Sequence, residues 1–209
     1  AAHCTPVDGA ILGPAHLNCD FTITTGKTIT ITGPIWVEGN ILLDNNVVLV
    51  LDPSFGATST VILADYPADT TLKGTIRTTN GVSICGSAGY DSGANQCNPS
   101  GGSYIMLLST YSGTVDKAIK IEQNVDGGIF YAAYGSAEIE NNASVKEIIA
   151  YKLELENNVT IVYESGLANA NFSSGPGASW QINDWKEIEQ KLAHKNDSLK
   201  QRESFLHRA

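Results

Sequence analysis

One short phrase returns four times along this chain and constrains its fold more than any other feature. In each copy aliphatic and charged residues lead into a pair of amides, and Ala or Val follows. The copies begin at Ile41, Ile119, Ile139 and Leu155. The amides of the last three copies are spaced by about 16 to 18 residues, an interval typical of architectures that add one structural unit per repeat.

The residues around these copies alternate between apolar and polar side chains. Ala137, Ile139, Ala143 and Val145 are apolar, and the residues beside them at 138, 140, 144 and 146 are polar. This period of two predicts half-buried β-strands. The first amide of each copy shares the parity of the apolar residues, so it is predicted to point inward, where an amide needs a partner. Stacked copies would satisfy such amides as a ladder, comprising Asn45, Gln123, Asn141 and Asn157.

A repeat built only of strands and corners predicts an all-β parallel solenoid, or β-helix, with one coil per repeat. It is expected to be right-handed, because crossovers between parallel strands of one sheet nearly always are. A β-sandwich with two similar hairpins remains an alternative. The expected order is an N-terminal cap at 1–20, the solenoid at 21–164 with a projecting polar loop at 85–102, a Gly/Pro/Ser-rich exit segment at 165–183, and a helix at 184–209. The apolar run 104–109 is expected to be a buried strand that lies beneath that loop.

The four cysteines form two local pairs, Cys4 with Cys19 and Cys85 with Cys97. Disulfides are predicted at both, since an even count without CxxC spacing fits an oxidising environment. A site of His3, Cys4, His16 and Cys19 for a metal is the alternative, although its spacing matches no common zinc module. No cofactor is expected.

The period changes near the C-terminus. Asp184 is a suitable helix cap, with Glu187 three residues further on. The apolar residues that follow at helical spacing are Trp185, Ile188, Leu192, Leu199 and Leu206. This tail helix is expected to contact the open end of a solenoid or a partner.

Charge and hydropathy narrow the possible partners. The net charge is −9, whereas a nucleic-acid partner would favour clustered Lys and Arg. From Lys186 to the end six Lys/Arg outweigh four Asp/Glu, so residues 1–185 carry −11. No apolar run is long enough to span a bilayer, and the start at Ala1 is expected to reflect the loss of a signal or anchor.

Catalytic constellations are sparse. The four histidines lie near the termini, which disfavours nucleophilic schemes that need a histidine base. Two other functions have partial support in the sequence. The Thr-rich segment 21–32 is similar to ice-binding arrays, but later repeats do not carry the threonines. Polysaccharide lyases and hydrolases use carboxylates with basic residues on one outer face, and the outward candidates here are Glu138, Glu140, Glu154 and Glu156 with Lys120, Lys146 and Lys152. A solvated face with cross-strand ion pairs is the simpler interpretation.

Residues 21–187 resemble the surface β-helix region of PilX-type, type IV pilus-associated bacterial proteins. The resemblance rests on "GNILLDNNVVLVLDPSFG", on the repeats "AEIENNASVKEIIAYKLELENNVTIVYE" and on "GLANANFSSGPGASWQINDWKE". It implies an extracellular parallel β-helix with a structural or adhesive role and no family-wide catalytic residues. The family's N-terminal hydrophobic helix is absent from this chain, and residues from Gln190 onward lie outside the likeness.

The sequence therefore predicts a non-enzymatic, disulfide-stabilised protein of the bacterial surface that self-associates into an appendage or filament and has an adhesive role. The alternative is a carbohydrate-binding or carbohydrate-cleaving β-helix, and a structural spacer without a ligand is a third possibility.

Overall fold

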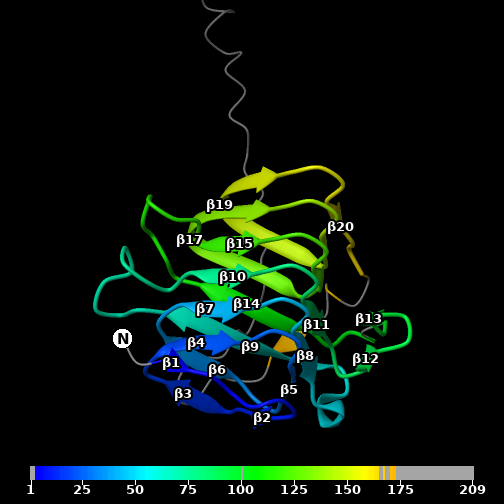
Figure 1. Ribbon diagram of the computed structural model, residues 1–209. Helices are drawn as coiled ribbons and strands as arrows, with labels where there is room; N and C mark the ends of the chain where they lie inside the picture. Colours follow the sequence, from blue (N-terminus) through cyan, green and yellow to red (C-terminus); the bar gives the residue numbers. More distant parts are fainter. Residues whose placement is uncertain (1–2, 100, 165–166, 168–169, 173–209) are drawn as a thin grey trace, which may run out of the picture.

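The computed structural model describes residues 3–99, 101–164, 167 and 170–172. They form parallel strands that lie one above another in three columns (Figure 1), which confirms an all-β fold with parallel strands. The described part contains a short 3-10 helix, η1 (Pro53–Phe55). Because β17 and β19 run through columns one and three, these columns join as one 12-stranded sheet, while column two is a separate 7-stranded sheet.

The chain visits the columns in turn and adds one strand to each. Column one contains β1 (His3–Cys4), β4 (Asp20–Ile23), β7 (Ile41–Leu43), β10 (Ile76–Thr78), β15 (Ile119–Ile121) and the second halves of β17 (Ile129–Ile139) and β19 (Glu147–Leu155). Column two contains β2 (Ile11–Leu12), β5 (Thr28–Ile31), β8 (Val48–Leu51), β11 (Ser83–Cys85), β16 (Asp126–Gly127), β18 (Ser144–Val145) and β20 (Thr160–Ile161). Column three contains β3 (Ala15–Leu17), β6 (Ile35–Glu38), β9 (Thr58–Asp65), β14 (Ile105–Ser109) and the first halves of β17 and β19. One passage through the three columns is called a level below.

The core lies between the columns, and the period of two decides which residues enter it. In β4, Phe21 and Ile23 are buried while Thr22 between them is not. The next strand of the same column repeats this pattern with Ile41 and Leu43. Register therefore places apolar side chains directly above one another, and burial of this continuous apolar column is the main force that holds the levels together.

The amide pairs lie in turns, and the predicted inward ladder is wrong. Gln123 and Asn157 are exposed, and Asn45 and Asn141 are half-buried. The alternation of buried and exposed side chains ends before each amide pair. The inward direction that odd and even numbering predicts therefore does not apply within the turn. The second residue of each turn instead has a left-handed backbone, with φ of 56° to 60° at the asparagines, and this set is Gly26, Asn46, Gly81, Asn124, Asn142 and Asn158.

These left-handed residues form the ladder that the structure does contain. From Gly26 to Asn142, each donates its backbone N–H to the carbonyl of the first turn residue one level further on, for example Asn46 to Asn80 at 3.0 Å and Asn124 to Asn141 at 3.2 Å. Side-chain bonds add to it, since Asn124 Nδ2 donates to Asn80 Oδ1 at 2.8 Å. Only Gly and Asn occupy these six positions because they tolerate the left-handed region best.

A pair of substitutions at Asn142 tests this explanation. Asn142→Ala is expected to lower the free energy of unfolding by about 1 kcal/mol, because a Cβ without a side-chain amide is strained at φ 60°. Asn142→Gly keeps the permissive backbone and is expected to be close to neutral. Chemical denaturation of both variants measures the difference, and equal losses for Ala and Gly would show that the side-chain amide, not the backbone, matters there.

The segment 1–20 differs from the irregular cap that was predicted. It supplies β1, β2 and β3, which pair in parallel with β4, β5 and β6, so it is the first level of the stack. The predicted helix at 184–209 and most of the exit segment at 165–183 lie outside the described residues.

The described exit residues pack against the outside of column three. Phe172 in β21 (Asn171–Phe172) pairs with Ser59 at the start of β9, and Leu167, Ala170 and Phe172 contact a small second core built on Tyr104, Met106 and Ile129. The run 104–109 is buried as expected, but it lies beneath this exit segment and not beneath the 85–102 loop. Outward-facing apolar residues on β14 and β17 therefore belong to the protein's own packing.

Candidate functional site

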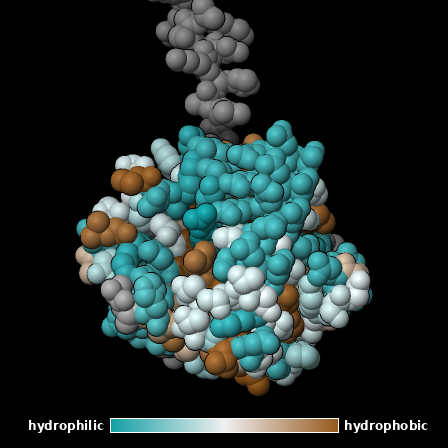
Figure 2. Space-filling view, in the orientation of Figure 1, coloured by the Kyte–Doolittle hydropathy of each residue, from teal (hydrophilic) through white to brown (hydrophobic). Residues whose placement is uncertain are grey.

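The outer side of column one forms a charged surface, called the charged face below. Register places Arg77, Lys120, Glu138 and Glu154 in one row across β10, β15, β17 and β19. Figure 2 shows that the upper part of this view, where these strands lie in Figure 1, is hydrophilic. The members of the charged face are Arg77, Lys117, Lys120, Glu122, Glu138, Glu140, Lys152 and Glu154.

Lysines connect the carboxylates of neighbouring strands across this face. Lys117 Nζ lies 2.6 Å from a carboxylate oxygen of Glu154 and 3.4 Å from one of Glu138. Lys120 Nζ lies 2.8 Å from Glu140 and 3.5 Å from Glu138. Lys152 adds a second contact to Glu154 at 2.8 Å, and Arg77 pairs with Glu122. Each carboxylate of the charged face therefore has a cationic partner, and the surface is close to neutral.

These contacts shift the pKa values of the partners in the directions that keep both partners charged. Hydrogen bonds from Lys117 and Lys152 lower the pKa of Glu154 to about 2. The hydrogen bond to Glu154 raises the pKa of Lys117, and the hydrogen bond to Glu140 raises the pKa of Lys120. A general acid needs a carboxyl pKa raised toward neutrality. Glu154 is shifted the other way, so its site suits cross-strand stabilisation better than proton transfer.

The shift at Glu154 predicts a dependence of stability on pH. Its folded pKa of about 2 lies below the ordinary value of 4.5, so its contribution is present above that value and is lost as the pH falls toward 2. Thermal unfolding of the unsubstituted chain and of Glu154→Gln is expected to differ at pH 6 and to converge as the pH approaches 2. A gap in melting temperature that stays constant from pH 6 to pH 2 would show that the ion pairs contribute nothing.

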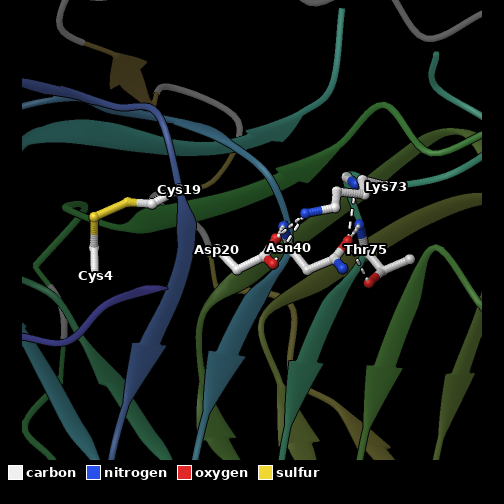
Figure 3. A network of polar contacts seen from close by, with 7 residues as sticks. Cys4, Cys19, Asp20, Asn40, Lys73 and Thr75 are labelled. Carbon is white, nitrogen blue, oxygen red and sulfur yellow. Dashed lines mark hydrogen bonds and ion pairs between the residues drawn. A yellow bond between two sulfur atoms is a disulfide. The ribbon is translucent and has the colours of Figure 1, made fainter. Parts of the chain in front are cut away.

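A second polar network lies at the corner that precedes β4, β7 and β10 (Figure 3). Asn40 Oδ1 accepts hydrogen bonds from the backbone N–H of Gly74 at 3.0 Å and from the backbone N–H and hydroxyl of Thr75 at 3.1 and 3.0 Å. Asp20 accepts from the backbone N–H of Asn40 at 2.9 Å and pairs with Lys73 Nζ at 2.9 Å. Burial raises the pKa of Asp20, but the bonds from Asn40 and Lys73 outweigh burial and lower it. These bonds connect three successive levels, those of β4, β7 and β10.

Aromatic residues gather on a different side of the molecule, the outside of column three. The rings of His16 and Trp36 stack with centroids 4.2 Å apart and planes inclined by 15°, and His16 Nε2 lies 2.8 Å from Glu38 Oε1. The indole nitrogen of Trp36 is buried and has no hydrogen-bond partner in the described part of the chain. The carboxylates of the charged face and these aromatic rings thus do not form one groove.

The segment between β11 and β14 contains an antiparallel hairpin of β12 (Tyr90–Asp91) and β13 (Gln96–Cys97), which projects beside column two in Figure 1. The Cys85–Cys97 disulfide and a 3.0 Å bond from the Cys97 N–H to Asp126 hold it against the stack. The tip is closed by its own contacts, because Asp91 Oδ1 accepts from the N–H groups of Gly93 and Ala94.

The strands β19 and β20 end the described stack with an apolar edge. Leu155 is 52% exposed, although its register partner Ile139 is fully buried. Ile161 is 45% exposed, although its partner Val145 is fully buried. Both residues face inward, and no further level covers them in the described residues. The sequence carries one signal of this edge, which is that the amide-pair repeat occurs for the last time at Asn157.

The remaining predicted site residues fall into three groups. The structure joins Cys4 to Cys19 and Cys85 to Cys97, the two pairs that the sequence predicted, with Cα atoms 5.9 and 5.1 Å apart. The alternative metal site at His3, Cys4, His16 and Cys19 is wrong because both cysteines are in a disulfide. The described part of the chain holds no other group of three or more residues suited to a metal ion. The tail residues Trp185, Ile188, Leu192, Leu199 and Leu206 lie outside the described residues.

The described residues include no apolar helix of a length that could span a bilayer.

Comparisons of the chain with protein-family models, with curated proteins and with solved structures found no match. Its function must therefore be argued from its own residues.

Proposed function

We propose that this chain is a right-handed parallel β-solenoid that serves as an extracellular structural protein, a subunit of a bacterial surface appendage or filament with an adhesive role. The observation that carries the proposal is the stacking of successive levels in register, such as Ile76 on Ile41 and Ile119 on Ile76, together with two disulfides. Right-handedness follows from the strong preference of parallel crossovers, and an experimentally determined structure tests it directly.

Three features support a structural role in an oxidising environment. The disulfides are typical of secreted and surface proteins. The charged face and the Asp20 network satisfy most of their own polar groups, so they stiffen the stack. The resemblance of residues 21–187 to PilX-type, type IV pilus-associated proteins points to the same kind of location and role.

Self-association through the C-terminal tail is the assembly mode that this proposal favours. Residues 1–185 carry a charge of −11 and the remaining segment is basic on balance, so the tail of one copy is attracted to the body of the next. A contact between two different surfaces propagates into a filament unless it closes.

Electron microscopy of the full chain beside a form lacking residues 189–209 tests this mode. Ordered fibres from the full chain that disappear on truncation are the expected result. Fibres that persist without the tail would exclude the tail as the connector. Uniform single particles from both forms would exclude self-assembly into filaments. A full-length variant in which Gln replaces Lys195, Lys200 and Arg202 keeps the apolar residues of the tail. It tests whether the charge of the tail or its apolar residues are needed for fibre formation.

Carbohydrate binding is the second candidate, and the stacked His16–Trp36 pair beside Glu38 is the observation that favours it. Sites for small molecules are lined mainly by aromatic and apolar side chains with a few placed polar groups, and this cluster offers both. A glycan array with the unsubstituted chain and with Trp36→Ala tests it. Binding that Trp36→Ala abolishes would support an adhesin, and no binding to any glycan would leave a structural spacer.

A further inference from the structure

The free edge of β19 combines apolar side chains with unpaired backbone groups. Glu156 donates its N–H to the carbonyl of Ile139 in β17 at 2.9 Å. Because backbone groups alternate in direction along a strand, even-numbered residues of this part of β19 face β17. Leu153 and Leu155 therefore direct their N–H and C=O groups to the opposite side, where the described residues contain no further strand. An exposed edge of this kind is a template for another strand.

The sequence along this edge is complementary to itself when read in the opposite direction. It reads Tyr151, Lys152, Leu153, Glu154, Leu155. We propose that two copies of this chain pair edge to edge through β19, antiparallel, about a two-fold axis at Leu153. Each Lys152 then lies opposite the other copy's Glu154, and each Tyr151 lies opposite the other copy's Leu155. Leu153, 39% exposed here, meets its counterpart.

Backbone direction limits the register, and charge selects it. The outward N–H and C=O groups require odd-numbered residues to pair with odd-numbered ones, which a two-fold axis at Leu153, Glu154 or Leu155 allows. Centring the pair on Glu154 would place two Glu154 carboxylates face to face. Centring it on Leu155 would place Glu154 opposite Glu156. Like charges directly opposite each other destabilise a strand pair, whereas opposite charges stabilise it.

The other end of the stack disfavours a head-to-tail contact through the same edge. β1 and β2 have two residues each and β3 has three. Pro6 and Pro14 lie in the connections of this first level, and proline has no backbone N–H to donate. A long apolar edge at one end and short, proline-flanked strands at the other favour a contact of the C-terminal edge with itself.

This pairing is independent of the proposed function, because it uses the edge of β19 and not the basic tail. A two-fold contact closes after two copies. In this dimer the first level of each copy lies at the end away from the contact. A filament built from such dimers would therefore need a second contact elsewhere.

Sedimentation equilibrium of the full chain over a range of concentrations tests the pairing. Below the concentration at which fibres form, the unsubstituted chain is expected to be dimeric. Lys152→Glu, which places Glu opposite Glu154 at two symmetric positions, is expected to raise the dimer dissociation constant about tenfold. Arg77→Glu makes the same charge change on the same face, three strands from the edge, and is expected to leave dimerisation unchanged. A chain that is monomeric at all concentrations overturns the proposal.

Two further variants test the strand contact and its register. Leu153→Pro removes an N–H that faces the free edge and keeps the N–H groups that face β17, so it is expected to abolish the dimer while circular dichroism shows an intact fold. A dimer that persists in Leu153→Pro overturns the proposal and points to the tail. Leu153→Cys is expected to give a disulfide-linked dimer on oxidation, because hydrogen-bonded antiparallel partners lie about 5.5 Å apart at Cα, within disulfide range. Arg77→Cys, the matched control, is expected to stay uncrosslinked; equal crosslinking of both variants overturns the register.

Discussion

Gly127→Ala is expected to lower the free energy of unfolding by about 3 kcal/mol, through the combined cost of a strained backbone and of overpacking. Gly127 has φ +85°, and a Cβ built on it would lie 2.3 Å from the carbonyl oxygen of Ile84. Ile84 is the register partner of Gly127 in column two. The clash is with backbone, so relief requires the two levels to separate there. Chemical denaturation monitored by circular dichroism measures the loss.

Gly26→Ala is the matched control for this prediction. Gly26 has a similar φ of +74°, but a Cβ there meets nothing within 4 Å. Gly26→Ala is expected to lower the free energy of unfolding by the conformational cost alone, about 1 kcal/mol. A similar loss at both positions would show that the close approach of β16 to β11 does not limit which residue position 127 accepts.

Removing either disulfide is expected to lower the free energy of unfolding by about 3 kcal/mol, because each closes a loop whose unfolded entropy it restricts. The separations are 15 residues for Cys4–Cys19 and 12 for Cys85–Cys97. The double variants Cys4→Ala with Cys19→Ala and Cys85→Ala with Cys97→Ala measure each contribution by chemical denaturation. Hydrogen exchange should localise the first loss to the first level and the second to the β12–β13 hairpin.

A chain with all four cysteines replaced by Ala is the control for the disulfide series. Reductant should destabilise the unsubstituted chain and leave the four-Ala chain unchanged. If reductant had no effect on the unsubstituted chain, the two bridges would contribute nothing to its stability, and the restriction of the unfolded loops would be offset by strain or by residual structure.

The sequence predicted some features because they depend on local pattern. Alternation at Ala137 and Ile139 indicated strands, since a side-chain period of two is a property of the extended backbone itself. The pairing of Cys85 with Cys97 followed from their nearness in sequence. The Asn-Asn pairs are repeated units, as predicted, but they do not point inward. Asn45 and Asn141 lie two residues past the ends of β7 and β17, where a left-handed turn at Asn46 or Asn142 interrupts the alternation.

Other features depend on contacts between levels that no local pattern encodes. The Asp20–Lys73 ion pair joins residues far apart in the sequence, and the 3.0 Å bond from Gly74 to Asn40 forms only once β7 and β10 are in register. The packing of Phe172 on column three could not be predicted either, because the exit segment has neither the period of a strand nor that of a helix.

Half-buried strands, repeated turns and two local disulfides follow from the sequence alone, because each depends on residues close together along the chain. Which side chains meet across levels, which outer faces are satisfied and which edge stays open depend on the three-dimensional fold. Inter-strand contacts depend on register, and register is fixed by the packing of the whole stack. The exposed edge of β19 is the clearest case, since Leu153 and Leu155 follow the same pattern as the buried Ala137 and Ile139 and differ only in lacking a level above them in the described chain.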